Sequence, residues 1–209
     1  MNRKQVGIVV FENVEVLDFC GPFEVFSVTR LNEEKRREEL SPFSVFLVAE
    51  TTSPVVATGG MKVLPDYDLD TCPQVDILVV PGGWGTRKQI DNERLLKWIA
   101  DRSRQVETLT SVCTGSLLLG KAGLLDGKRA TTHWRSLEWM QELFPKVIVE
   151  RQLHFVEDGA LFTSAGISAG IDMSLKVVAR YFGESVARAT ARHMEYPFPE
   201  TDERRITLA

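Results

Sequence analysis

Apolar runs of strand length recur along the chain and alternate with segments in which apolar residues return at helical intervals. In residues 92–102, for example, Leu95, Leu96, Trp98 and Ile99 form one helical face. Continuously apolar strands that alternate with helices indicate a parallel sheet covered on both faces. The pattern therefore predicts an α/β sandwich of three layers. The expected strands span residues 6–11, 43–49, 75–80 and 106–112.

Short β-prone runs around glycine turns predict two hairpins outside these strands, at residues 53–66 and 151–166. Near the C-terminus, the spacing of apolar residues predicts helices over 171–181 and 185–194, with Gly183 as the break between them. A charged run at residues 32–42 is expected to be a solvated loop and not a domain boundary. We therefore expect a single domain over residues 1–209.

Composition narrows the class of protein. The 209 residues carry a formal net charge of -4, with 44% hydrophobic residues, which is typical of a globular protein and gives no reason to expect nucleic acid or membrane as a partner. The three cysteines are widely spaced, and no N-terminal apolar run is long enough for a signal peptide. A cytoplasmic protein is predicted. The cysteines and histidines are scattered and lack the spacing of metal ligands, so no metal site is expected.

Cys113 stands at the end of an apolar run, in the segment TSVCTGSLLLG. In open α/β sheets, ligands bind where each strand gives way to its helix. Gly115 permits the sharp strand-to-helix turn that carries nucleophiles. Because a helix N-terminus favours an anion, the pKa of the thiol is expected to fall. The alternative is a small buried side chain, and packing is the preferred interpretation for Cys20 and Cys72.

Further candidates follow the other expected strands. Gly82 and Gly83, in VVPGGWG, would let backbone N–H groups approach a ligand as an oxyanion hole requires, with a plain turn as the alternative. Asp18 follows the first strand and is either an acid or a helix N-cap. His133 beside Trp134 is either a proton-transfer group or a hydrogen-bonded pocket wall.

The chain resembles the ThiJ/PfpI superfamily, and most closely its isonitrile hydratase branch, through about residue 197. The resemblance is carried by the segments VGIVVFENVEVLDFCGPFEVFS, VVPGGWG, TSVCTGSLLLGKAGLLDGKRATTHW and TSAGISAGIDMSLKVVA. The Pro-Gly-Gly sequence is found across the superfamily. The Cys-Thr-Gly elbow with GLLDGKRATTHW is specific to the hydratase branch and to the sensor domains of AraC-type regulators.

This resemblance implies a flavodoxin-like sandwich, a homodimer, a small-molecule substrate and no cofactor. It further implies that Cys113 is the nucleophile and Asp18 the acid, where many superfamily members carry glutamate. It also makes Thr114, directly after the cysteine, a catalytic residue, which matches one that contributes to the hydratase site through its amide, with its hydroxyl as a second candidate. Thr114 stands where protease-like members carry a histidine, which argues against a Cys-His peptidase. The resemblance assigns the anion-stabilising loop to Gly82 and Gly83. It places Ile167 near the nucleophile helix. Ile167, Trp84 and Trp134 together suggest that the pocket is apolar.

The chemistry that such a site would perform sets its own demands. An isonitrile reacts with a thiolate at its terminal carbon, which must then gain a proton to give a thioimidate. Nucleophile and proton donor must therefore converge on one atom, and Cys113 and Asp18 supply that pair, sharing one proton. Two alternatives remain open: a ligand-sensing domain of the AraC-regulator type, and a glyoxalase-like or deglycase-like enzyme acting on reactive carbonyls.

Overall fold

A seven-stranded sheet forms the centre of the protein, in the strand order β10-β11-β7-β6-β1-β2-β5. The computed structural model describes residues 3–207. All neighbouring strands of this sheet run parallel except β10, which is antiparallel to β11. The strands are β1 (Lys4–Val9), β2 (Phe43–Ala49), β5 (Tyr67–Asp68), β6 (Ile77–Val80), β7 (Thr108–Val112), β10 (Phe155–Asp158) and β11 (Leu161–Ser164).

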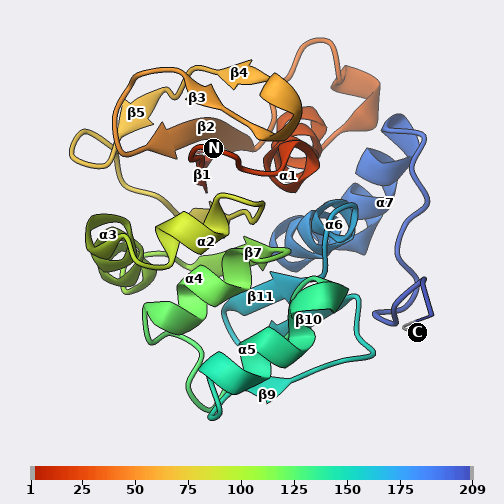
Figure 1. Cartoon of the computed structure of the whole chain (residues 1–209). Coiled ribbons are helices and arrows are strands. Elements are labelled where there is room, and N and C mark those ends of the chain that lie inside the picture. Colours follow the sequence, from red (N-terminus) through yellow and green to blue (C-terminus); the bar gives the residue numbers. More distant parts are fainter. Residues whose placement is uncertain (1–2, 208–209) are drawn as a thin grey trace.

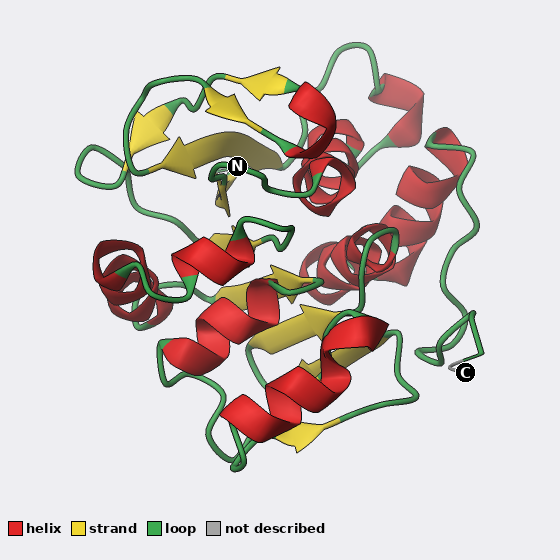
Figure 2. Ribbon diagram, in the orientation of Figure 1, coloured by secondary structure: helices red, strands yellow, loops and turns green. Residues whose placement is uncertain are grey.

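Helices cover both faces of the sheet (Figures 1 and 2). One face carries α1 (Val16–Val28), α6 (Ala169–Phe182) and α7 (Glu184–His193). The other carries α2 (Thr86–Gln89), α3 (Glu93–Ser103) and α4 (Gly115–Lys121), while α5 (Leu137–Leu143) packs beside the end of the sheet that holds β10 and β11. This arrangement confirms the flavodoxin-like three-layer α/β sandwich.

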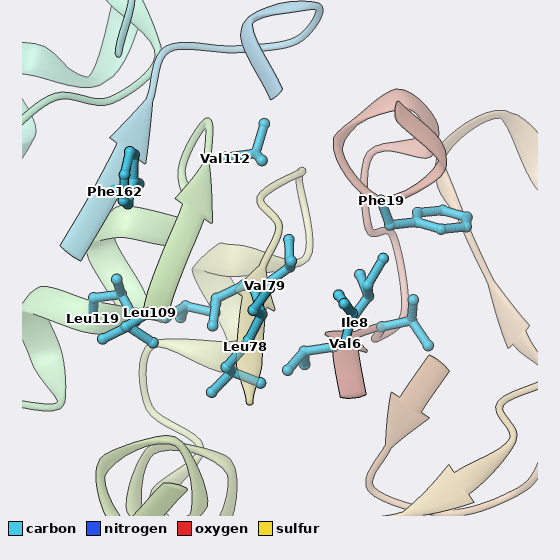
Figure 3. Close-up of a cluster of buried hydrophobic side chains, with 14 of the residues drawn as sticks. Val6, Ile8, Phe19, Leu78, Val79, Leu109, Val112, Leu119 and Phe162 are labelled. Carbon is cyan, nitrogen blue, oxygen red and sulfur yellow. The ribbon is translucent and has the colours of Figure 1, made fainter. Parts of the chain in front are cut away.

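The central strands are apolar without interruption because both of their faces are buried. All of β6 is buried, and Figure 3 shows Leu78 and Val79 directed to opposite sides of it, one toward each helical layer. Val6 and Ile8 of β1 are likewise fully buried. Each such side chain contributes about 1.5–3 kcal/mol when removed from water, so this core is the main source of stability.

Most predicted elements are confirmed, with shifted ends. Strand β2 has the predicted bounds, whereas β1 begins at Lys4 because backbone pairing with β2 from Phe43 onward needs no apolar side chain. Helix α3 begins after Asn92, whose side chain caps the amide of Leu95. Gly183, with φ of 89°, separates α6 from α7 as expected.

The two predicted hairpins differ in their place in the fold. The first forms a separate ribbon of β3 (Val55–Val56) and β4 (Lys62–Val63). The second is β10 and β11, but β11 pairs parallel with β7, so this hairpin completes the central sheet. The small pair β8 (Arg129–Ala130) and β9 (Ile148–Val149) was not predicted, because two-residue strands leave no periodic pattern. Across residues 3–207, every helix falls short of the length and apolar character that crossing a membrane requires.

Candidate active site

Loops after three adjacent strands meet at the carboxyl edge of the sheet. Strands β1, β6 and β7 are neighbours, and the loops that follow them carry the chain to α1, α2 and α4. The residues that the sequence singled out in these loops and at the start of α1 are thereby brought together. Asp18, Gly82 and Cys113 form the centre of the candidate site.

Cys113 occupies the sharp turn between β7 and α4. Its φ is 56°, in the left-handed region that residues with a Cβ rarely adopt, so the turn is strained as a nucleophile elbow is. The Cys113 amide donates to the carbonyls of Ser164 and Ala165 at 3.1 and 3.2 Å. A Cβ on Gly115 would lie 2.0 Å from the carbonyl oxygen of Val80, so only glycine permits this close passage.

Asp18 is fully buried in the first turn of α1. Its Oδ2 accepts a hydrogen bond of 3.0 Å from the Gly82 N–H, while Oδ1 is buried with no hydrogen-bond partner among the described residues. The helix has no side-chain cap, so the N-cap alternative for Asp18 is wrong. Buried polar atoms without partners are rare, and they mark sites where chemistry or a ligand supplies the partner.

The thiol is not acidic, contrary to the expectation from its place before a helix. Cys113 is only 6% exposed. Burial raises the pKa of the thiol well above its usual value, the nearby Asp18 raises it further, and the opposing effect of the Thr114 amide is smaller. Burial likewise raises the pKa of Asp18. No hydrogen bond of normal geometry joins Oδ1 to the sulfur, but the thiol is close enough to influence the carboxyl pKa.

The amides of the Gly-Gly loop have protein acceptors. The Gly82 N–H binds Asp18, and the Gly83 N–H donates to Thr114 Oγ1 at 3.0 Å. The Thr114 hydroxyl also shares a hydrogen bond of 2.9 Å with the Thr86 hydroxyl. These amides therefore hold the acid and the elbow in place, which revises the interpretation of Gly82 and Gly83 as an oxyanion hole. The hydrogen bonds of the Thr114 hydroxyl to Gly83 and Thr86 hold these loops together.

A cavity of about 430 Å³ opens onto the thiol. The predicted pocket residues Trp84, His133 and Ile167 line this cavity, as do Cys113 and Thr114. A volume of this size suits a small organic molecule.

The prediction that Trp134 lines the pocket is wrong, and a tryptophan that was not predicted takes part instead. Trp134 does not line the cavity, and its side chain is 38% exposed. The guanidinium of Arg135 lies over the Trp134 ring, 4.7 Å from the ring centroid. Trp139 of α5 lines the cavity instead. Trp134 adjoins the cavity residue His133 in the sequence, but the short helical turn Trp134–Ser136 directs its side chain elsewhere.

His133 is a neutral wall of the cavity. Burial lowers the pKa of His133, and the nearby Arg135 lowers it further. The ring Nδ1 accepts a hydrogen bond of 3.3 Å from the Arg135 amide. A Cβ on Gly166 would lie 2.7 Å from both Cys113 Sγ and His133 Cδ2, so only glycine fits beside the thiol and the imidazole, and no hydrogen bond joins the two side chains among the described residues. This arrangement supports the pocket-wall interpretation of His133.

A second buried polar pair lies away from the thiol. His154 Nε2 and Asp172 Oδ2 are 2.7 Å apart, and Arg205 donates to Asp172 Oδ1 at 2.9 Å. Glu157, the next acidic residue after His154 in the chain, pairs with Arg180 on the surface and not with His154. His154 therefore has a structural role. Within residues 3–207, no group of three or more His, Cys, Asp or Glu residues is placed to hold a metal ion.

The C-terminal segment holds the loop that follows β8. Arg204 donates from Nε to the Arg151 carbonyl at 2.6 Å, and from Nη2 to Thr131 Oγ1 and the Thr132 carbonyl, both at 2.9 Å. The Thr132 hydroxyl in turn donates to the Cys113 carbonyl at 3.0 Å. The tail thus stabilises the loop that buttresses the elbow.

Replacing Arg204 with Ala is expected to lower the free energy of unfolding by about 2 kcal/mol, because charge-assisted hydrogen bonds to partly buried acceptors are lost. Urea denaturation at one pH measures the change. Arg37→Ala, at an exposed position, is the matched control for the loss of charge and should cost less than about 0.5 kcal/mol. Equal losses in the two variants would contradict this role of Arg204.

Several cavity residues were not anticipated from the sequence: Glu15, Arg87, Arg135 and Trp139. Glu15 and Arg135 lie within three residues of predicted site residues, so their position in the sequence could have indicated that they line the cavity. Arg87 follows the Gly-Gly loop in the same way. Trp139 has no such signal, because its place depends on how α5 packs against the rest of the fold.

Sequence comparisons agree with this geometry. A model of the DJ-1/PfpI family matches residues 4–180. Isonitrile hydratase of Pseudomonas putida is 37% identical over 199 residues, which cover 95% of this chain and 81% of the hydratase. The HTH-type transcriptional regulator GbdR of Pseudomonas aeruginosa is 31% identical over 209 residues, which cover 99% of this chain and 55% of the regulator.

Solved structures share the fold. A ThiJ/PfpI family protein from Pseudomonas syringae superposes with a TM-score of 0.82 at 31% identity, over 97% of this chain and 79% of that one. An AraC family transcriptional regulator from Pseudomonas putida gives a TM-score of 0.77 at 19% identity, over 91% of this chain and 99% of that one, a likeness of fold alone. With its strained cysteine elbow, its flavodoxin-like sheet and a family match over most of its length, the chain belongs to the DJ-1/PfpI family.

Proposed function

We propose that the protein is a cysteine-dependent hydratase that adds water to an isonitrile and forms an N-substituted formamide. The observation that carries this proposal is the buried, unpartnered Oδ1 of Asp18 beside the buried thiol of Cys113. Cys113 lines the cavity, and the fully buried carboxyl of Asp18 is close enough to the thiol to exchange a proton with it, as the reaction requires. The similarity to an isonitrile hydratase over 95% of the chain supports the same reaction.

The first half of the reaction forms the thioimidate. The Cys113 sulfur attacks the terminal isonitrile carbon as its proton passes to Asp18, and the carboxyl then delivers that proton to the same carbon. An S–H bond is broken, and C–S and C–H bonds are formed. Because burial raises the pKa of Asp18, its carboxyl holds a proton at a higher pH than an exposed carboxyl does. The Gly82 N–H fixes Oδ2, which leaves Oδ1 to transfer the proton.

The second half releases the product. Asp18, again a carboxylate, takes a proton from water, and the hydroxide adds to the thioimidate carbon. The carboxyl then protonates the nitrogen. As the C–S bond breaks, the carbonyl forms and the hydroxyl proton returns to sulfur. The net change is the addition of one water molecule, and no oxidant, reductant or cofactor is consumed.

A direct assay tests the proposal. The protein is incubated with cyclohexyl or p-nitrophenyl isonitrile and formamide is measured, with methylglyoxal in parallel. Formamide formation that is abolished in Cys113→Ala and retained in Cys20→Ala is the expected result, since Cys20 does not line the cavity. Lactate from methylglyoxal without formamide would instead favour an enzyme acting on reactive carbonyls.

Ligand sensing is the second candidate function. It is favoured by the match to the regulator GbdR, which covers 99% of this chain. Tight binding of a small molecule without turnover of either substrate would support sensing over catalysis. The homodimer, the single domain over residues 1–209 and the cytoplasmic location stay predictions. Light scattering of the purified protein measures the first of these.

A further inference from the structure

Two arginines of the thiol cavity have no anionic partner among residues 3–207. Arg87 and Arg135 both line the cavity. The ion pairs within residues 3–207 all use other cations. In the same part of the chain neither guanidinium donates a hydrogen bond, and the one polar bond found for Arg135 comes from its backbone amide. Two guanidiniums on one cavity therefore keep their donors available to a ligand.

Aromatic rings hold these guanidiniums in place. The Arg87 guanidinium lies 4.3 Å from the ring centroid of Trp84 and 5.5 Å from that of Trp139. The Arg135 guanidinium lies 4.7 Å from the ring of Trp134. Stacking fixes the plane of a guanidinium while leaving its N–H groups free at the edge, so less side-chain entropy is lost when an anion binds.

The charge balance of the cavity is positive. Its charged side chains are the two arginines and one carboxylate, Glu15. The other titratable groups that face it are neutral near pH 7: the buried thiol of Cys113 has a raised pKa, and His133 has a lowered one. Among the side chains that line the cavity, one cation is therefore left without a compensating charge; the Asp18 carboxyl that takes the thiol proton is fully buried and does not line the cavity.

We propose that the substrate carries a carboxylate in addition to its reactive group, and that Arg87 and Arg135 bind that carboxylate. This inference rests on the proposed hydratase function, in that the reactive group is taken to be an isonitrile. A planar guanidinium matches a carboxylate through paired N–H donors, which lysine does not. Anchoring the anion at the arginines sets the orientation of the substrate, so that the isonitrile carbon is directed to Cys113.

The test compares two substrates that differ in one charge. The kcat/KM values are measured for 4-isocyanobenzoate and for its methyl ester, and their ratio is the readout. The wild-type protein is expected to favour the carboxylate by roughly tenfold or more, and Arg87→Gln with Arg135→Gln to bring the ratio near one. Arg104→Gln, which removes the same charge from an exposed position at the end of α3, should keep the wild-type ratio. A wild-type ratio at or below one, or an unchanged ratio in the double variant, overturns the inference.

A second measurement separates this inference from the hydratase proposal. Iodoacetate and iodoacetamide alkylate thiols alike but differ in charge, and mass spectrometry of the Cys113 peptide reports both rates. The double variant is expected to lower the iodoacetate-to-iodoacetamide rate ratio roughly fivefold to tenfold, whether or not any isonitrile is hydrated. An unchanged ratio overturns the anion site, while a lowered ratio without formamide in any assay overturns only the hydratase proposal.

Discussion

Replacing Asp18 with Asn is expected to lower kcat/KM for isonitrile hydration by about a thousandfold, the size of effect that a positioned acid-base group supplies. The amide keeps the shape of the side chain, and its oxygen still accepts from the Gly82 N–H. Its NH2 group is too weak an acid and too weak a base to exchange a proton with Cys113 or with carbon. Formamide formation under single-turnover conditions measures the loss, and a variant that retains wild-type turnover would remove Asp18 from the mechanism.

The same variant is expected to gain stability relative to the wild type as the pH rises. Burial raises the pKa of Asp18 above its unfolded value of 3.8. A raised folded-state pKa means that folding favours the protonated form. The stability from this group is full below the unfolded pKa and is lost as the pH rises through the folded pKa. Asn carries no such dependence, so the difference in Tm between variant and wild type should grow from pH 4 to pH 7.5.

A matched variant distinguishes charge from packing in this experiment. Asp18→Ala also removes the buried charge, but it leaves the Gly82 N–H without an acceptor, which costs about 1–3 kcal/mol. Asp18→Ala should therefore be less stable than Asp18→Asn at every pH. The Asp18→Ala and Asp18→Asn variants both retain Cys113, so titration of the thiol affects the stability of the two variants alike. A Tm difference between Asp18→Asn and wild type that is constant with pH would show that Asp18 is ionised without penalty.

Gly82→Ala is expected to lower the free energy of unfolding by about 3 kcal/mol, within the range of severe overpacking in a core. An added Cβ would lie 2.4 Å from Thr114 Oγ1, 2.5 Å from Thr114 N and 2.9 Å from Gly115 N. Two of these atoms belong to the backbone of the elbow, so neither can rotate away. The loop must shift and withdraw its N–H from Asp18, and activity should fall together with stability.

Gly60→Ala provides the control for this substitution. Gly60 has a φ of 88°, and an added Cβ would meet no atom within 4 Å. Gly60→Ala should then lower the free energy of unfolding only by the strain of a left-handed backbone conformation, about 1–2 kcal/mol. Urea denaturation of both variants isolates the effect of crowding. If Gly82→Ala proves as mild as Gly60→Ala, the contact between the loop and the elbow is looser than the structure indicates.

The fold followed from the sequence because buried parallel strands leave a continuous apolar signal. Residues 43–49 illustrate this, since the apolar run and strand β2 coincide. The parallel arrangement also explains why Asp18, Gly82 and Cys113 were found: loops after neighbouring strands share one edge of the sheet. The strands β8 and β9 were missed because each is two residues long, and their pairing joins segments distant in the chain.

The pKa shifts and the hydrogen-bond partners of the site could not be predicted from sequence patterns. The place of Cys113 before a helix is a local property and suggested an acidic thiol, but burial by distant segments has the larger effect on its pKa. In the same way, the Gly-Gly sequence indicated available N–H groups, whereas the acceptors on Asp18 and Thr114 come from other loops. Trp139 faces the cavity through tertiary packing alone.

The bonds that join the three loops have an evolutionary consequence. Asp18, Gly82, Gly83, Thr114 and Thr86 are linked to one another by hydrogen bonds that involve no residue of α5 or of the turn Trp134–Ser136. The reactive centre is therefore held together without the part of the cavity wall that α5 and this turn supply. Exchange of side chains on α5 and that turn can alter which molecules are admitted while the chemistry is conserved, a route by which one scaffold diversifies into catalysts and receptors.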